Sequence, residues 1–277
     1  MQVKQARHFE NSIFINLLDA SMGIMFDQFI DAALLYPLVI ILLVGAAELG
    51  ARIGRRVSQN LERSEDMTTL TASTLGLLAL LLAFSLSHAL SRYEARRTLI
   101  LEEANAIGST ANFAAMLPKQ AQPEILSLLR EYVAVRIGLR RPYDPAKLER
   151  DAARSREILA KLWQQAVTVS EPQSLPANRF INSLDEMTKI QERRLISAQY
   201  YVPNAILLML LGLAIVALGF TGYQSALMQS RRSAPKFITA ITIAVVIVLV
   251  VDLDQPARGF IRVPTQALVD VAKDIQP

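Results

Sequence analysis

The sequence contains no cysteine and only two histidines, His8 and His88, among its 277 residues. Without thiols, disulfide bonds and thiolate metal sites are excluded. The histidines lie too far apart in the sequence to form the spaced pair typical of zinc sites. No nucleophile elbow, glycine-rich phosphate loop or carboxylate dyad in a recognisable motif is present either. The sequence therefore argues against an enzyme, and we expect neither a metal nor another cofactor.

Positive charge is in only slight excess: the net charge is +4 and the pI is near 9.4. By contrast, 52% of the residues are hydrophobic, which is too apolar for a soluble domain of this length. Basic residues in such a chain typically lie beside anionic lipid headgroups, so we expect a lipid bilayer as the partner and no nucleic acid.

Four apolar runs approach the length of about 20 residues that crosses a hydrocarbon core of about 30 Å. They are Leu34 to Leu49, Leu70 to Leu90, Val202 to Phe220 and Phe237 to Val251. Residues 1–33 have Lys4 and Arg7 ahead of an apolar stretch, but acidic residues interrupt it and no cleavage site follows. We interpret them as an amphipathic helix at the membrane interface rather than a signal peptide.

The segment between the second and third spans has a helical composition without alternating β-branched runs. In it, Glu124 to Leu139 places apolar residues, Tyr132 and Arg136 on one helical face. The fold class is thus all-α, an integral membrane protein of four transmembrane helices with a long helical stalk domain between spans 2 and 3. The expected divisions are 1–33 (interfacial helix), 34–90 (spans 1 and 2), 91–201 (extramembrane helices), 202–252 (spans 3 and 4) and 253–277 (C-terminal tail).

The second span runs directly into charged sequence. From Leu77 to Ile107 no proline or glycine interrupts the helical pattern. About 31 helical residues are about 46 Å long, which exceeds the hydrocarbon thickness. We therefore expect one unbroken helix that leaves the membrane as a rigid rod.

Basic residues near the span ends favour cytoplasmic short loops, with the termini and the long insert outside. The short connections carry Arg52, Arg55, Arg56, Arg63, Arg231, Arg232 and Lys236, and the termini carry Lys4, Arg7, Arg258, Arg262 and Lys273.

One face of the second span combines hydroxyls, leucines and basic residues at three- and four-residue steps. Its members are Thr71, Thr74, Leu78, Leu81, Ser85, His88 and Arg92. In an oligomer such a face can line a pore with a hydrophobic constriction and a basic, anion-concentrating mouth. The alternative is that the hydroxyls pack against neighbouring helices while His88 and Arg92 reach the interface.

The remaining charged residues near the spans have local explanations. Glu48 can pair with Arg52 one turn later, and Glu102 and Glu103 point to different sides of a helix that we interpret as solvated. For Asp252 and Asp254 we favour pairing with nearby arginines over ion coordination.

Three stretches, "LSRYEARRTLILEEANAIG", "LLREYVAVRI" and "VDLDQPARGFIRV", resemble the bacterial membrane family known as the bestrophin-like domain. The positions that match the family's motifs are Arg92, Tyr93, Glu94, Glu102, Glu103, Asn105, Asp252, Asp254, Pro256 and Gly259. The resemblance implies a multi-pass protein of the bacterial inner membrane, and kinship with bestrophins, which are pentameric anion channels whose second span lines the pore.

The sequence departs from bestrophins in three respects. It has no aromatic neck triplet in the second span, only Phe84, and no acidic calcium clasp. The charge count also places the insert outside, whereas the helical domain of bestrophins is cytosolic. Our leading hypothesis is a homo-oligomeric, anion-preferring ion channel. The alternatives are a non-conducting scaffold or sensor whose helical insert binds a partner protein, and a transporter, whose repeated halves with broken helices are not evident.

Overall fold

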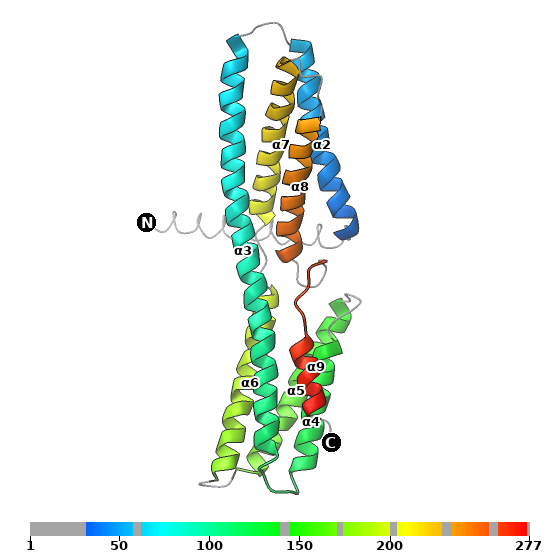
Figure 1. The fold of residues 1–277 in the computed structure, drawn as a ribbon. Coiled ribbons are helices and arrows are strands. Elements are labelled where there is room, and N and C mark those ends of the chain that lie inside the picture. The colour runs from blue at the N-terminus through cyan, green and yellow to red at the C-terminus, as the bar shows by residue number, and fades with distance from the viewer. Residues whose placement is uncertain are drawn as a thin grey trace, which may run out of the picture. The chain divides into compact units, whose positions relative to one another are not determined.

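A computed structural model describes residues 32–57, 62–138, 145–170, 174–199, 204–228, 234–254 and 260–275. Within these ranges every regular element is an α-helix, which confirms the all-α fold class (Figure 1). The interfacial helix expected before Ala32 lies outside the described residues, as do Pro256, Arg258 and Gly259.

The chain forms two compact units. The first, which we call the membrane unit, holds α2 (Ala32–Val57), the first part of α3 (Glu62–Ala114), α7 (Asn204–Leu227) and α8 (Ala234–Asp254). The second, which we call the helical unit, begins at Ser91 within α3. It adds α4 (Gln122–Gly138), α5 (Pro145–Thr168), α6 (Leu175–Gln199) and α9 (Gln266–Asp274).

All four predicted spans correspond to helices long and apolar enough to cross a membrane. The qualifying stretches are Tyr36–Arg56, Met67–Ala114, Ala205–Leu227 and Ala234–Asp254. Leucines and alanines from all four helices meet in the core of the membrane unit, among them Leu43, Ala47, Leu78, Leu210 and Ala244. Because lipid is as apolar as these side chains, close packing rather than the hydrophobic effect holds such helices together.

Glycines bring α2 and α7 into backbone contact. A Cβ placed on Gly50 would collide with the carbonyl of Gly219, and one on Gly222 with the carbonyl of Ala47. At Gly54 it would lie 2.7 Å from the carbonyl oxygen of Tyr223. Gly50 and Gly54 form a G-x-x-x-G pattern, whose small residues let two membrane helices approach closely. This spacing marks the contact between α2 and α7 in the sequence itself.

The predicted unbroken helix is confirmed, because α3 is one helix of 53 residues, about 80 Å long. It therefore exceeds the hydrocarbon core by about 50 Å. Its C-terminal part belongs to the helical unit, where Ile100, Ala104 and Ile107 are buried in the core.

The helical unit packs the predicted face of α4 inward. Ile125, Leu129, Tyr132, Val133 and Arg136 are buried there, as the spacing predicted. Residues 261–275, expected only as a tail, belong to this unit. In α9, Leu268 is fully buried, and Arg130 Nε of α4 donates to the Ile275 carbonyl at 2.9 Å.

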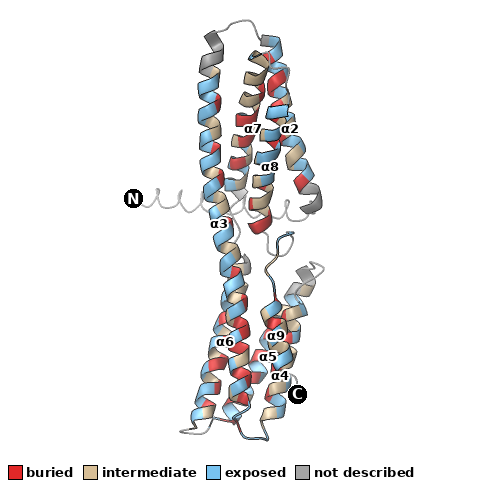
Figure 2. Cartoon of the chain, in the orientation of Figure 1, coloured by how far each residue is buried: buried red, intermediate tan, exposed pale blue. Residues whose placement is uncertain are grey.

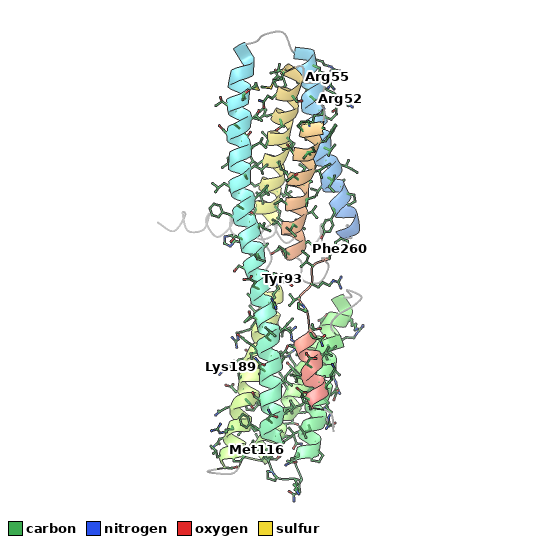
Figure 3. All side chains as sticks on the ribbon, in the orientation of Figure 1. Arg52, Arg55, Tyr93, Met116, Lys189 and Phe260 are labelled. Atoms are coloured by element: carbon green, nitrogen blue, oxygen red, sulfur yellow. The ribbon has the colours of Figure 1, made fainter. Side chains whose placement is uncertain are left out.

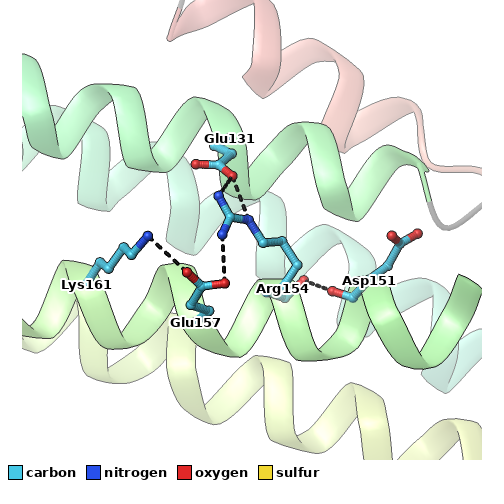
Figure 4. Close-up of polar contacts among 6 residues, drawn as sticks. Glu131, Asp151, Arg154, Glu157 and Lys161 are labelled. Atoms are coloured by element: carbon cyan, nitrogen blue, oxygen red, sulfur yellow. Dashed lines mark hydrogen bonds and ion pairs between the residues drawn. The ribbon is translucent and has the colours of Figure 1, made fainter.

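Ion pairs on the surface join α4 to α5 (Figure 4). Arg154 Nε donates to Glu131 at 2.8 Å and its Nη1 to Glu157 at 2.7 Å, while Lys161 Nζ lies 3.0 Å from Glu157. Hydrogen bonds from Lys161 and Arg154 hold the pKa of Glu157 below its usual value. These solvated groups orient the two helices but add little stability.

Candidate functional site

The first half of α3 is the least enclosed of the four spans (Figure 2). Only 17% of its most apolar stretch is buried, compared with 28% for α2, 28% for α7 and 39% for α8. Thr71, Leu78, Leu82 and Ala89 form the strip that faces the protomer's own bundle. The rest of the helix surface is available to lipid or to other subunits.

The seven predicted pore-lining residues differ in exposure. Thr71 and Leu78 are 3% and 1% exposed, so these two face the bundle of their own chain. Four others, Thr74, Leu81, Ser85 and Arg92, are half-buried, and His88 is exposed. The pore-lining role of these five remains a prediction.

A stripe one residue earlier carries the same polarity pattern and is exposed along its whole length. We call it the α3 stripe, and its members are Ser73, Leu77, Leu80, Phe84, Ser87 and Ser91. Leu77, Leu80 and Phe84 are 50%, 53% and 58% exposed. A shift of one residue rotates a helical face by about 100°. Serines at both ends and large apolar side chains in the middle thus share an outward face.

Hydroxyl groups in this part of α3 are satisfied by their own helix. Ser73 Oγ donates to the Thr69 carbonyl at 2.8 Å, and Thr74 Oγ1 to the Leu70 carbonyl at 2.9 Å. Such bonds remove the cost of placing a hydroxyl in an apolar environment. The oxygen lone pairs remain able to meet water.

Glu103 is the centre of a buried polar cluster in the helical unit, which corrects our interpretation of it as solvated. Its carboxylate is fully buried. Tyr132 donates to Oε1 at 2.9 Å, and Arg136 donates to Oε1 at 2.7 Å and to Oε2 at 3.4 Å. Arg194 of α6 pairs with Oε2. One carboxylate thereby joins α3, α4 and α6.

Burial sets the protonation states in this Glu103 cluster. It lowers the pKa of Arg194 to about 10 and also lowers the pKa of Arg136, while it raises the pKa of the Tyr132 phenol. Arg194 therefore stays charged and Tyr132 stays a donor at neutral pH. The adjacent Glu102 is half-buried and lies 3.4 Å from Arg193, so the two neighbouring carboxylates have different environments.

Asp252 closes a second buried cluster, at the end of α8 in the membrane unit. Oδ1 accepts hydrogen bonds from the Tyr36 hydroxyl and, at 2.7 Å, from the backbone N–H of Phe260. The rings of Tyr36 and Phe260 lie 5.5 Å apart between centroids. Asp252 thus connects the start of α2 with the chain that follows α8. Asp254 is equally buried.

Comparison with known proteins decides the family. The sequence model of the bestrophin-like domain matches residues 40–268, which is most of the chain. The chain belongs to the bestrophin-like domain family. Among functionally curated proteins, no sequence matches it.

Crystal structures of a bacterial bestrophin homologue from Klebsiella pneumoniae share the bestrophin-like fold. One, of a single-residue variant, is 18% identical and covers 85% of this chain and 97% of that chain, with a TM-score of 0.65. A second is 16% identical, covers 87% and 96%, and also has a TM-score of 0.65. Another single-residue variant is 17% identical and covers 87% of this chain and 96% of that chain, with a TM-score of 0.66. Identities this low establish the fold alone.

Bestrophin-like motif residues are divided between the two units. In the helical unit Glu103 is buried in its cluster, Glu94 and Asn105 are exposed, and Tyr93 is half-buried with its hydroxyl 3.5 Å from the Arg262 carbonyl. Asp252 and Asp254 belong to the membrane unit.

The partners of the two buried carboxylates were not predicted from the sequence: Tyr36 binds Asp252, and Arg194 pairs with Glu103. Arg136, an arginine on the buried face of α4, was the signal that a buried carboxylate had to face it.

Proposed function

We propose that the protein is an oligomeric ion channel of the bacterial inner membrane in which the α3 stripe lines a central pore. The exposure of α3 is the observation that carries this proposal, because the span least enclosed by its own chain has the most surface available to other subunits. In such an assembly, the exposed side chains of Leu77, Leu80 and Phe84 from several subunits would form a hydrophobic constriction. Such a constriction gates by dewetting.

The kinship with bestrophins supports a homopentamer, and the four apolar helices support a multi-pass arrangement in lipid. In this assembly Ser73 at one end and Ser87 and Ser91 at the other would border the constriction with polar vestibules. Small ions, rather than a bulky substrate, fit a lumen bounded by single helices.

Shortening the constriction side chains tests the pore. We expect L80A and F84A, each reconstituted in liposomes, to pass chloride about tenfold faster than wild type, because a barrier lowered by about 1.4 kcal/mol gives that factor. L38A is the matched control, since Leu38 is exposed to a similar extent on α2 but lies outside the stripe. Folded, oligomeric wild-type protein that conducts nothing at any voltage, membrane tension or pH would remove the proposal.

We further propose that the channel prefers anions, because His88 and Arg92 lie one turn apart beside the stripe at one mouth. Near a membrane surface each basic residue contributes about 1 kcal/mol, so R92Q should lower the chloride-to-sodium permeability ratio about fivefold. Reversal potentials in asymmetric salt measure it. K189Q, in the exposed part of α6, should leave the ratio unchanged (Figure 3). A ratio unaffected by R92Q would place the selectivity elsewhere.

The scaffold alternative has one observation in its favour. Met116, which follows α3, is 62% exposed (Figure 3). Val167 near the end of α5 and Leu175 at the start of α6 are 74% and 63% exposed. Exposed apolar side chains at one end of a domain are typical of a docking surface. Crosslinking followed by pulldown discriminates the two functions: a stoichiometric partner lost in M116S/V167S, with no conductance in the wild type, favours the scaffold.

A further inference from the structure

Basic side chains gather around one carboxylate at the end of the membrane unit where α2 ends and α8 begins. Glu48 Oε1 lies 3.0 Å from Arg55 Nη2 and 3.5 Å from Arg52 Nε. Lys236 Nζ donates to Oε2 at 2.7 Å. Three cations surround one carboxylate, so these four side chains have a net charge of +2. The exposed Arg56 on the same turn of α2 adds a further positive charge.

The cations of this cluster have different environments. Lys236 is only 5% exposed, and its ammonium lies 4.9 Å from the centre of the Phe237 ring, so Glu48 and the ring already satisfy it. Arg52 and Arg55 are 68% and 55% exposed and lie at the end of α2 (Figure 3). Each guanidinium carries five N–H donors, most of which Glu48 does not use.

An apolar strip of α2 leads up to the arginines. Leu42, Leu49 and Ile53 are 42%, 58% and 48% exposed. Gly45 lies between the two leucines, and a Cβ placed on it would meet no atom within 4 Å, so the strip has a shallow notch there. Because α2 crosses the hydrocarbon core, this strip faces acyl chains while the arginines reach headgroup level.

We propose that this face of α2 is a binding site for an anionic phospholipid, with the phosphate on Arg52 and Arg55 and an acyl chain along Leu49 and Leu42. Guanidinium groups bind phosphate oxygens in a bidentate manner, and Glu48 fixes the orientation of both arginines. The two uncompensated charges select against zwitterionic headgroups, whose own ammonium would be repelled. The apolar strip favours a lipid over free phosphate.

Arg52 and Arg55 are more than half exposed, so their outer donors face the surroundings.

Native mass spectrometry of the full-length protein tests the site, with phosphatidylglycerol and phosphatidylcholine offered in equal amounts. We expect wild type to retain phosphatidylglycerol selectively, and R52Q/R55Q to bind it about 30-fold more weakly, from about 1 kcal/mol per basic residue. R52K/R55K keeps the charge and should lose less. R156Q removes an exposed arginine of α5 and should match wild type.

Three results would overturn the proposal. Equal retention of the two lipids by wild type would show that the cluster does not select anionic headgroups. Displacement of phosphatidylglycerol by millimolar inorganic phosphate would assign the site to a free anion. If the selectivity for phosphatidylglycerol over phosphatidylcholine stays constant as ionic strength rises, its origin is not electrostatic. This measurement uses wild type, so it tests the site even if R52Q/R55Q fails to fold. None of these outcomes depends on whether the protein conducts ions.

Discussion

The variant E103A is expected to destabilise the helical unit by about 3 to 5 kcal/mol, because it leaves buried arginines without their counter-charge. Arg136 is 3% exposed and donates two hydrogen bonds to this carboxylate, while Arg194 has lost most of its water through burial. The penalty is thus mainly the desolvation of unpaired cations rather than the lost attraction. Urea unfolding followed by the emission of Trp163, the only tryptophan, measures it, since its indole N–H donates to Thr188 across the α5 and α6 contact.

Two controls separate the Glu103 cluster from charge in general. E102A removes the neighbouring carboxylate, but Glu102 and Arg193 are 41% and 50% exposed, so we expect a loss of no more than about 1 kcal/mol. E103M/R136M replaces both partners by apolar side chains, and should be less harmful than E103M alone because one fewer charge is stranded. Equal losses for E102A and E103A would show that Glu103 is not uniquely paired.

Element order and type were predictable because α-helices leave a strong local pattern. Four apolar runs predicted α2, the first part of α3, α7 and α8, and the absence of helix breakers from Leu77 to Ile107 predicted the continuity of α3. The inward face of α4 followed from its spacing. Each of these conclusions needs only information within one helix.

The rotational phase of α3 was not predictable in the same way. Its membrane-crossing part carries hydroxyl residues on more than one side, so no single polar face marks which side meets the bundle. The burial of Thr71 and Leu78, and hence the outward direction of the α3 stripe, depends on contacts with helices far away in the sequence. The hydroxyl residues did not indicate the buried side either, because their side chains can donate to carbonyls of their own helix on any side of it.

Glu103 shows the same limit for charged residues. Glu102 and Glu103 are adjacent on a charged helix, and local sequence gives no reason for one to be buried. The information lies on α4, where Tyr132 and Arg136 share a turn of a face that is otherwise apolar. An arginine on a buried face requires a carboxylate partner, but which of several acidic residues supplies it is decided by the packing of α3 on α4.

The variant G222A is expected to separate α2 from α7 and to destabilise the membrane unit by about 1 to 3 kcal/mol. The new Cβ would collide with the carbonyl of Ala47, which is backbone and cannot rotate away as a side chain would. The change is measured as a shift in the midpoint of thermal unfolding in detergent, monitored by size-exclusion chromatography of heated samples. G50A, which collides with the carbonyl of Gly219 from the other helix, should behave in the same way.

G212A is the matched control on α7, because a Cβ on Gly212 would meet no atom within 4 Å. Alanine has the higher helix propensity, so this variant should be neutral or slightly stabilising. The two substitutions are chemically identical and differ only in what faces the new methyl group. A similar loss for both would mean that general effects on helix α7 dominate, and that close backbone approach to α2 does not hold the membrane unit together.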